Sequence, residues 1–573
     1  MTEPNRKPPY RYLLLAAVAT AAGAAWAWWA PRLGWAGGAA ADPWPVPVDT
    51  LGALRIAVCF ALPAVAWAVA AAAWWPRLAL RLAGLLAHRG FVAALIVLAV
   101  AATAVLGAAV LGPAPRDYDE AGLLFQSKVF AGGGLAAFAP PTEGDLTEAF
   151  FRSRTEVVRG GRWFAVFGPL HPALLALGAW AGWAKLIPAL AAGVVLAATY
   201  LLARRKWGYF AAAVAVVLVA TSPLFLFTHA SYYAEATFLA FFALALLAAE
   251  ALGRNGRRRE AVALGLAAGA AFLTSTYATL YLAVPLAWYL ARRAKAGQPP
   301  GDRLWWFGAA ALPFVAAWGL YNWRQTGNFF LPPALYAPGG YVGFDGGYGP
   351  AEALAATARN AVAVASDAFG WPLLCLLPAI IRLFLKPRLD DFEKALYGVF
   401  VVTAVASPFV RESGASFGAR PYYGAALALA FITARFFGIL GTSGPLRLRR
   451  AGEGVAALVL LASVAVNGAA YLPRAVAYYG RPRPEAAWAQ PEVRRAVAAA
   501  GIADAVVIVR PREGCLTAVP GSPEFDEPVV FARDNGPRNR ELRRLFRGRD
   551  IAELELGEAG PQAWKTNGSP PER

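Results

Sequence analysis

Cysteine, histidine and charged residues are all scarce in this sequence. The three cysteines, Cys59, Cys375 and Cys515, stand far apart and indicate neither a disulfide framework nor a CxxC metal site. Charged residues make up 16% of the chain, whereas a soluble protein has about a quarter. Together with 58% hydrophobic residues, this low charge excludes an ordinary soluble enzyme and predicts a polytopic membrane protein.

The charges that are present are unevenly balanced, with 54 basic and 36 acidic residues and a net charge of +18. A basic surface is typical of proteins that bind nucleic acid. Here, however, most Lys and Arg residues fall in short loops between apolar runs, which is the pattern that anchors loops on the cytoplasmic side of a membrane. We therefore expect membrane lipid as a partner, and no nucleic acid.

Apolar runs of about 20 residues recur along the chain, each long enough to cross the hydrocarbon layer as a helix. The backbone must be helical there because unpaired amides cannot face lipid. We predict roughly thirteen transmembrane helices. They cover residues 12–30, 51–75, 90–111, 186–203, 209–228, 234–252, two spans within 261–290, and 304–321, 371–385, 395–410, 423–440 and 455–472.

The basic loops predict the orientation of these spans. Clusters such as Arg204 to Lys206 and Arg257 to Arg259 fall on one side, which the charge rule makes cytoplasmic. The expected location is the inner (plasma) membrane, with the N-terminus cytoplasmic and the C-terminus periplasmic or extracellular. A cleaved signal peptide is the alternative for residues 12–30, although its three tryptophans are unlike a cleavage region.

The sequence predicts three parts. Residues 1–89 hold N-terminal transmembrane helices, and residues 90–472 form a transmembrane module with outer loops at 113–185 and 322–360. Residues 473–573 change character. PEVRRAVAAA and NRELRRLFRG are typical of helices, whereas AVVIVR, PVVFAR and IAELEL are typical of strands. We expect a small extramembrane α/β domain there.

The first outer loop is unusually polar for a segment between two spans. It carries both signs of charge, and the candidate site residues in it are Asp119, Glu120, Lys128, Arg162 and His171. A carboxylate held near cations stays ionised and can act as a general base towards a hydroxyl. Cations can also stabilise a departing phosphate. The alternative interpretation is a helix cap with solvated loop charges.

Further candidates lie at other span ends on the predicted outer side. They are His229, Glu235, Arg324 and Arg411. Each has a structural alternative: a hydrogen-bonded interfacial histidine, a charge at a helix N-terminus, or an arginine reaching the interface. A metal site would need a third ligand, which the sequence does not place, so divalent-metal dependence stays open and no cofactor is implied.

Several segments resemble a known family. DYDEAGLLFQSKVFAGGGL, GPLHPALLALGAWAG and LAATYLLARRKWG are similar to the GT-C superfamily of lipid-carrier-dependent glycosyltransferases, which includes the protein O-mannosyltransferases and the lipid A aminoarabinose transferases. The resemblance covers most of residues 90–445. It implies a GT-C-like fold and places the acidic residue of the first outer loop, the family's catalytic base or acceptor-orienting group, at Asp119, with Glu120 beside it.

The resemblance also implies groups for the carrier phosphate. The family's His-Pro-Pro motif corresponds to His171-Pro172-Ala173, where the second proline is missing. Arg420-Pro421-Tyr422-Tyr423 is similar to a basic-aromatic motif beside the carrier site, and we place Lys128 with these phosphate-binding groups.

The implied activity is the transfer of a sugar, with inversion, from a polyprenyl-phosphate donor to a hydroxyl of a protein, lipid or glycan acceptor. The loop at residues 329–350 would cover the site. Two alternatives stay open: a transporter or flippase of lipid-linked sugars, and a non-catalytic envelope assembly subunit. A transporter predicts inverted repeats and mid-span charges, and the sequence shows no convincing repeat and few such charges.

Overall fold

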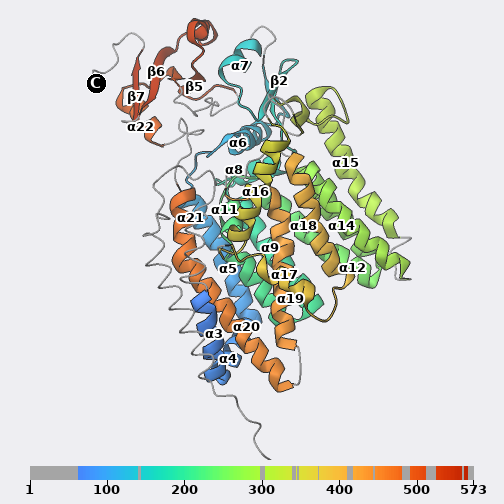
Figure 1. The fold of residues 1–573 in the computed structure, drawn as a ribbon. Helices are drawn as coiled ribbons and strands as arrows, with labels where there is room; N and C mark the ends of the chain where they lie inside the picture. Colours follow the sequence, from blue (N-terminus) through green and yellow to red (C-terminus); the bar gives the residue numbers. More distant parts are fainter. Residues whose placement is uncertain are drawn as a thin grey trace, which may run out of the picture.

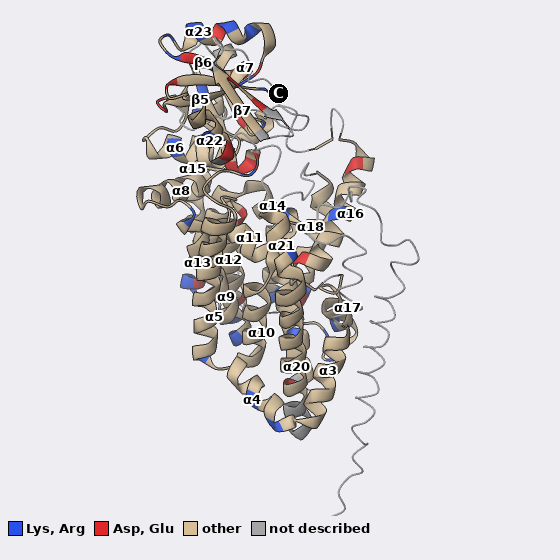
Figure 2. Cartoon of the chain, turned by 90° about the vertical axis from the view of Figure 1, so that its left-hand side faces the viewer, with Lys and Arg blue, Asp and Glu red and all other residues tan. Residues whose placement is uncertain are grey.

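The computed structural model of this chain is a long helical bundle with two small sheets at one end (Figure 1). It describes residues 62–139, 144–296, 303–337, 343–344, 348–371, 373–409, 417–442, 446–480, 491–510, 524–557 and 560–565. The predicted span at 12–30 lies outside the described residues, as does the first part of 51–75. Figure 2 shows few charged residues along the bundle and many in the small domain at its end.

The long helices run along the bundle and follow the apolar segments of the sequence. They are α5 (Arg89–Val105), α9 (Leu186–Trp207), α12 (Glu235–Asn255), α13 (Arg258–Thr274), α14 (Thr276–Lys295), α15 (Leu304–Thr326), α16 (Pro350–Asp367), α18 (Asp391–Ala406), α19 (Tyr423–Thr442) and α20 (Leu446–Val466). The shorter ones are α3 (Leu62–Trp74), α4 (Pro76–Leu86), α6 (Tyr118–Ala131), α7 (Gly144–Phe150), α8 (Leu170–Trp180), α10 (Tyr209–Ala220), α11 (Pro223–His229), α17 (Leu377–Phe384), α21 (Leu472–Tyr479), α22 (Pro491–Ala499) and α23 (Leu542–Leu545).

Within the described residues, 7 helices are long and apolar enough to cross a membrane, and α10 with α11 forms a further pair bent by 62°. This confirms a multi-pass helical membrane fold, while the count of roughly thirteen spans stays a prediction. The division of residues 261–290 is confirmed, because α13 ends at Thr274 and α14 begins at Thr276. Ser275 between them has extended backbone angles, which interrupt the helix.

The predicted span at 371–385 is wrong. In its place α16 runs from Pro350 to Asp367, and α17 has only 8 residues. Gly370, with φ of +65°, turns the chain between them, a backbone conformation that glycine adopts without strain. The predicted outer loop at 322–360 therefore includes the first part of α16, whose Ala-rich and partly polar sequence gives a weak signal for a span.

Two sheets lie at the end of the bundle where α6 begins (Figure 1). The first loop forms a three-stranded antiparallel sheet in the order β1-β3-β2, from β1 (Ala137–Phe138), β2 (Glu156–Arg159) and β3 (Arg162–Ala165). The C-terminal sheet has the order β5-β4-β6-β7, from β4 (Ala505–Arg510), β5 (Val529–Arg533), β6 (Asp550–Gly557) and β7 (Gly560–Lys565). The strands β5, β4 and β6 are parallel, and β7 is antiparallel to β6.

The C-terminal sheet packs directly against α6. Alternate residues of β4 point to opposite faces, as expected for a strand. Val507 shares one buried cluster with Ala121 of α6, whereas Val506 shares another with Phe125 and Val129. The predicted small α/β unit is therefore present, and α6 contributes to its hydrophobic core.

A buried carboxyl group in the first sheet makes stability depend on pH. Glu156 is fully buried and accepts a hydrogen bond from Trp163 Nε1 at 2.9 Å. Burial raises the pKa of Glu156 to about 7, so the folded protein favours the protonated form. The contribution of Glu156 to the free energy of unfolding is fully present below the ordinary pKa of a glutamate. It is lost as pH rises through about 7.

We expect Glu156→Gln to raise the thermal midpoint at pH 8 and leave it nearly unchanged at pH 4. At about 1.4 kcal/mol per pKa unit, the gain in the free energy of unfolding at pH 8 amounts to about 3 kcal/mol. Thermal unfolding in detergent at both pH values measures it. Glu148→Gln, at a part-exposed carboxylate paired with Arg152, is the control. Equal midpoint shifts at the two pH values would contradict the prediction.

Candidate active site

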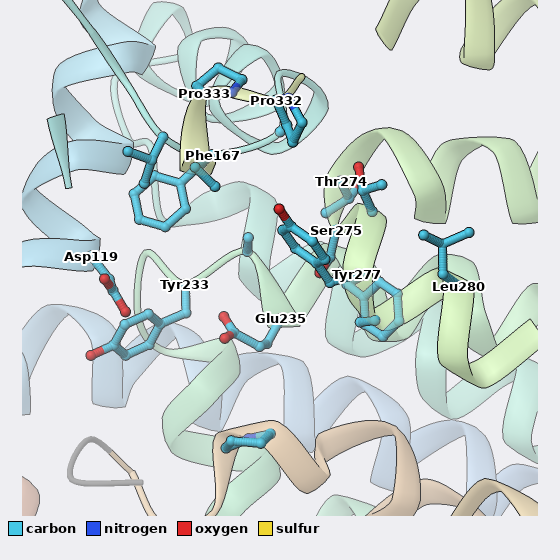
Figure 3. Close-up of a pocket in the computed structure, with 18 of the residues that line it drawn as sticks. Asp119, Phe167, Tyr233, Glu235, Thr274, Ser275, Tyr277, Leu280, Pro332 and Pro333 are labelled. Carbon is cyan, nitrogen blue, oxygen red and sulfur yellow. The ribbon is translucent and has the colours of Figure 1, made fainter. Parts of the chain in front are cut away.

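A cavity of about 350 Å³ lies where α6, α12, α13, α14 and α15 meet. Its wall is largely apolar and aromatic, and Asp119, Glu235 and Arg420 are charged residues in it. Figure 3 shows Asp119, Tyr233 and Glu235 at one end of this cavity and Leu280 at the other. Gly168 closes one side, and a side chain there would collide with the carbonyl oxygen of Leu273, 2.5 Å from its Cβ position.

Asp119 lies in the first turn of α6, and the start of this helix is fixed by a cap. Asp117 is the N-cap residue, and its carboxylate accepts a hydrogen bond from the Glu120 amide at 3.0 Å. The hydroxyl of Tyr233 donates a further hydrogen bond to Asp117. The Asp119 side chain is 18% exposed and lines the cavity. The helix N-terminus also favours a negative charge at this position.

Arg420 joins the two acidic residues of the cavity. One guanidinium nitrogen lies 2.9 Å from Asp119 Oδ2 and the other 3.8 Å from Glu235 Oε1. Its central carbon lies 3.9 Å from the centre of the Tyr233 ring, in a cation–π contact. The Arg420 side chain is only 5% exposed. This packing holds the Asp119 carboxylate close to the Arg420 guanidinium and leaves it accessible from the cavity.

Glu120 lies behind the cavity wall. It is fully buried and accepts hydrogen bonds from the Arg116 amide at 2.8 Å and the Tyr232 amide at 3.0 Å. Burial raises the pKa of Glu120, and the charge of nearby Lys185 opposes this rise. Burial also lowers the pKa of Lys185 to about 8. Glu120 therefore ties α6 to the turn that precedes Glu235, whereas Asp119 faces the cavity.

The other predicted phosphate-binding residues lie away from the cavity. Lys128 is 3.7 Å from Glu527 of the C-terminal unit, and Arg162 donates to the carbonyl of Arg324. His171 is buried, and its Nε2 donates to the carbonyl of Tyr232 at 2.8 Å. The residues of the described cavity wall include neither these three residues nor Arg324.

Two of the remaining predicted residues lie just beyond the wall. His229 is buried, and its Nδ1 lies 2.7 Å from the hydroxyl of Tyr423, which does line the cavity. Tyr422 is buried next to Pro421. Arg411 lies outside the described residues. The structure therefore brings Asp119, Glu235 and Arg420 together in the cavity.

Several residues of the wall were not predicted. Ser275 lies at the break between α13 and α14, Tyr277 and Tyr281 lie in the first two turns of α14, and Trp318 and Asn322 belong to α15. The TSTY sequence in the middle of a long apolar run was a signal for the break, but its place beside Asp119 depends on the fold. Within the described residues, no group of three His, Cys, Asp or Glu side chains could hold a metal ion.

The loop at residues 329–350 contributes one wall, as Pro332, Pro333 and Ala334 line the cavity. Farther along this loop, the Gly343 amide donates to the carbonyl of Phe409 at 2.9 Å. The parts of the loop that the structure describes thus lie over the end of α18 and beside the cavity. That it closes over a bound substrate stays a prediction.

A second buried carboxylate supports the segment that carries Arg420. Asp367 accepts hydrogen bonds from the hydroxyls of Tyr471 and Tyr479. Gly418 packs against it, with φ of +77°, and a Cβ at Gly418 would lie 2.4 Å from Asp367 Oδ2.

We expect Gly418→Ala to lower the free energy of unfolding by about 1–3 kcal/mol, because of both the strained backbone and the collision. The thermal midpoint measures this loss. Gly308→Ala in α15, where the added Cβ would meet nothing within 4 Å, is the control and should be neutral or stabilising. Equal effects of the two changes would contradict the prediction.

Comparisons with known proteins agree with this architecture. Residues 169–323 match the family model described as dolichyl-phosphate-mannose-protein mannosyltransferase. No curated protein matches the chain in sequence. The crystal structure of ArnT from Cupriavidus metallidurans bound to undecaprenyl phosphate is 14% identical, covers 82% of this chain and 94% of its own, and has a TM-score of 0.51. The apo structure of the same protein is 14% identical, with 82% and 93% covered and a TM-score of 0.49.

The family match covers the region from α8 through most of α15, which forms much of the cavity wall. The fold of the ArnT complex extends over most of the chain. Together these findings confirm the resemblance to the GT-C superfamily of glycosyltransferases that the sequence predicted.

Proposed function

We propose that this chain is a membrane glycosyltransferase that moves a sugar, with inversion, from a polyprenyl-phosphate carrier to an acceptor hydroxyl. The observation that carries the proposal is the cavity in which Asp119 is paired with Arg420 beside Glu235. The mannosyltransferase family match and the shared fold with a protein that binds undecaprenyl phosphate support the same class of donor.

The proposed reaction is a single displacement at the anomeric carbon. The acceptor oxygen attacks this carbon and gives its proton to the Asp119 carboxylate. The bond between the anomeric carbon and the phosphate oxygen breaks, and polyprenyl phosphate leaves. General base catalysis of this kind contributes about 10²- to 10⁴-fold to a rate. In the described cavity wall, Arg420 is the cation that can counter the charge on the leaving phosphate.

Glu235 is suited to binding sugar hydroxyls in this scheme. Its side chain is 27% exposed, lines the cavity and lies farther from Arg420 than Asp119 does. A carboxylate accepts hydrogen bonds from neutral hydroxyl groups, so Glu235 would hold the sugar, and the cation Arg420 would hold the phosphate. Glu120 and Lys185 hold the surrounding backbone and do not act on substrate.

The orientation we propose places the cavity at the outer face of the cytoplasmic membrane. α9 ends in Arg204, Arg205 and Lys206, and α14 ends in Arg292, Arg293 and Lys295. Both helices start near the cavity and run away from it, so their basic ends mark the opposite side, which the charge rule makes cytoplasmic. The proposed parts are residues 1–89, the catalytic module at 90–472, and an outer α/β domain at 473–573.

Reconstituted vesicles test the function against the transporter alternative. Purified protein is supplied with a polyprenyl phosphate that carries a radiolabelled sugar, and with envelope extracts as acceptors. We expect label to leave the lipid and join an acceptor, with Asp119→Asn as the inactive control. Label that stays on the lipid and only changes leaflet would favour a flippase, and label that neither moves nor transfers would favour an assembly subunit.

A further inference from the structure

The C-terminal unit carries an exposed group of arginines on one short helical segment. The segment begins as a 3-10 helix at Gly536–Glu541 and continues directly into α23. Leu542 is buried and packs this segment on the core of the unit. Four arginines of the segment and of the turn after it are exposed, and we call them the basic face. They are Arg540, Arg543, Arg544 and Arg547.

Two further arginines beside the basic face have structural partners. Arg538 donates two hydrogen bonds of 3.2 Å to the carboxylate of Glu541. Arg549 donates to the carbonyl oxygens of Glu527 and Phe525, at 2.7 and 3.0 Å. In the part of the chain that the structure describes, no hydrogen bond or ion pair engages the side chains of the basic face. Arg538 and Arg549 therefore stabilise the fold, whereas the basic face is available to a partner.

The spacing of the basic face costs stability. Arg543 and Arg544 follow Arg540 by three and four residues, so their side chains are neighbours on one side of the helical segment. Like charges at this spacing destabilise a helix by about 0.2–0.5 kcal/mol per pair. Glu541, the acidic residue of the segment, is already paired with Arg538. A partner with several closely spaced negative charges would relieve this repulsion, and the planar guanidinium groups suit carboxylate and phosphate.

The position of the basic face argues against membrane lipid as this partner. Figure 2 shows α23 at the end of the C-terminal unit that lies away from the helical bundle, beyond β5 and β6. Lipid headgroups surround the ends of the bundle, and salt screens exposed charges beyond about 8 Å. In the proposed orientation this end also lies outside the cytoplasm, away from cellular nucleic acid.

The surface around the basic face also lacks the features of a protein interface. Protein interfaces are centred on large apolar or aromatic side chains that become buried on binding. Within the described residues of the C-terminal unit, no large hydrophobic side chain is exposed. A polysaccharide with recurring acidic groups needs no such anchor, because its charges alone attract it to a basic surface.

We propose that the basic face binds an anionic glycan of the cell envelope, through the carboxylate or phosphate groups that recur along its chain. The inference rests on the proposed function, because that function places the C-terminal unit outside the membrane. It goes beyond sugar transfer, since the basic face is no part of the wall of the cavity that holds Asp119. A glycan bound there holds the outer unit of the protein on the envelope.

Binding by the full chain in phosphatidylcholine nanodiscs tests the proposal. The probes are polygalacturonate for carboxylate, a phosphomannan for phosphate and dextran as the neutral glycan. Combining Arg540→Gln, Arg543→Gln and Arg544→Gln should raise the Kd for the acidic glycan by at least about tenfold. The thermal midpoint of this variant should equal or exceed that of wild type, because the repulsion between arginines falls.

A second triple variant is the matched control. Arg257→Gln, Arg258→Gln and Arg259→Gln remove the same charge from an exposed cluster elsewhere, and the Kd should stay within about twofold of wild type. Equal losses in the two variants would overturn the proposal, because net charge alone would then explain binding. Wild-type protein that binds neither acidic glycan, or binds dextran as tightly, would also overturn it.

Two other polyanions separate the remaining partners. A loss confined to phosphatidylglycerol vesicles or to single-stranded RNA would assign the basic face to lipid or to nucleic acid, and the proposal would fail. Sugar transfer by the same preparations is measured separately. Glycan binding without any transfer would count against the proposed function and leave the glycan site in place.

Discussion

Asp119→Asn is expected to lower kcat for sugar transfer by about 10²- to 10⁴-fold, the contribution of a general base. Asparagine keeps the shape of the side chain and can still accept a hydrogen bond from Arg420, which lies 2.9 Å from the carboxylate. It removes the carboxylate that takes the acceptor proton in the proposed mechanism. KM for the donor should change much less, because in the proposed scheme donor binding uses Arg420 and Glu235.

Initial rates at several donor concentrations separate these effects for Asp119→Asn. Asp504→Asn, at a 69% exposed carboxylate of the C-terminal unit, is the control and should retain full activity. A loss that appeared only in KM would place Asp119 in donor binding. Activity close to that of wild type would remove it from the reaction altogether.

Arg420→Gln should damage both stability and transfer. Asp119 and Glu235 would lose the cation that lies between them. Breaking a buried ion pair costs about 3–5 kcal/mol, and because both carboxylates are partly exposed we expect about 2 kcal/mol here. Transfer should fall at least about 100-fold, because the leaving phosphate also loses its counter-charge. Arg420→Lys should not restore transfer, because a lysine cannot reach both carboxylates as a planar group.

A double-mutant cycle isolates the pair. If the stability loss of Arg420→Gln comes from the unpaired Asp119, then adding Asp119→Asn should recover part of the thermal midpoint without recovering activity. Thermal unfolding and transfer rates of the two single variants, the double variant and wild type give the coupling. Additive losses of stability would show that the two side chains do not interact in the folded protein.

Much of the fold could be predicted from the sequence, because lipid imposes strict conditions on it. Apolar runs bounded by basic clusters located α5, α9, α12 and α19 to within a few residues. The α16 and α17 region could not be predicted in the same way. α16 mixes alanine with Glu352, Arg359 and Asp367, and its hydrogen bonds to Tyr471 and Tyr479 depend on helices far along the chain.

The candidate site could be predicted only in part from the sequence. Asp119 and Glu235 were predicted because charges at span ends are unusual, and Arg420 because its motif resembles one of the GT-C superfamily. That the three meet in one cavity could not be predicted from their separation in the sequence. Lys128 lies on the same helix as Asp119, yet its side chain pairs with Glu527 of the C-terminal unit. The direction of a side chain changes within one helix turn of three or four residues. The residue that it contacts lies hundreds of residues away in the sequence.

The shared core of α6 and the C-terminal sheet has a consequence for biosynthesis. Ala121, Phe125 and Val129 are packed by strands that the ribosome adds only after the helices of the bundle. Until those strands emerge, the helix that carries Asp119 lacks part of its hydrophobic support. In a nascent chain that has already inserted its helices, α6 would therefore lack part of its packing until these strands have folded.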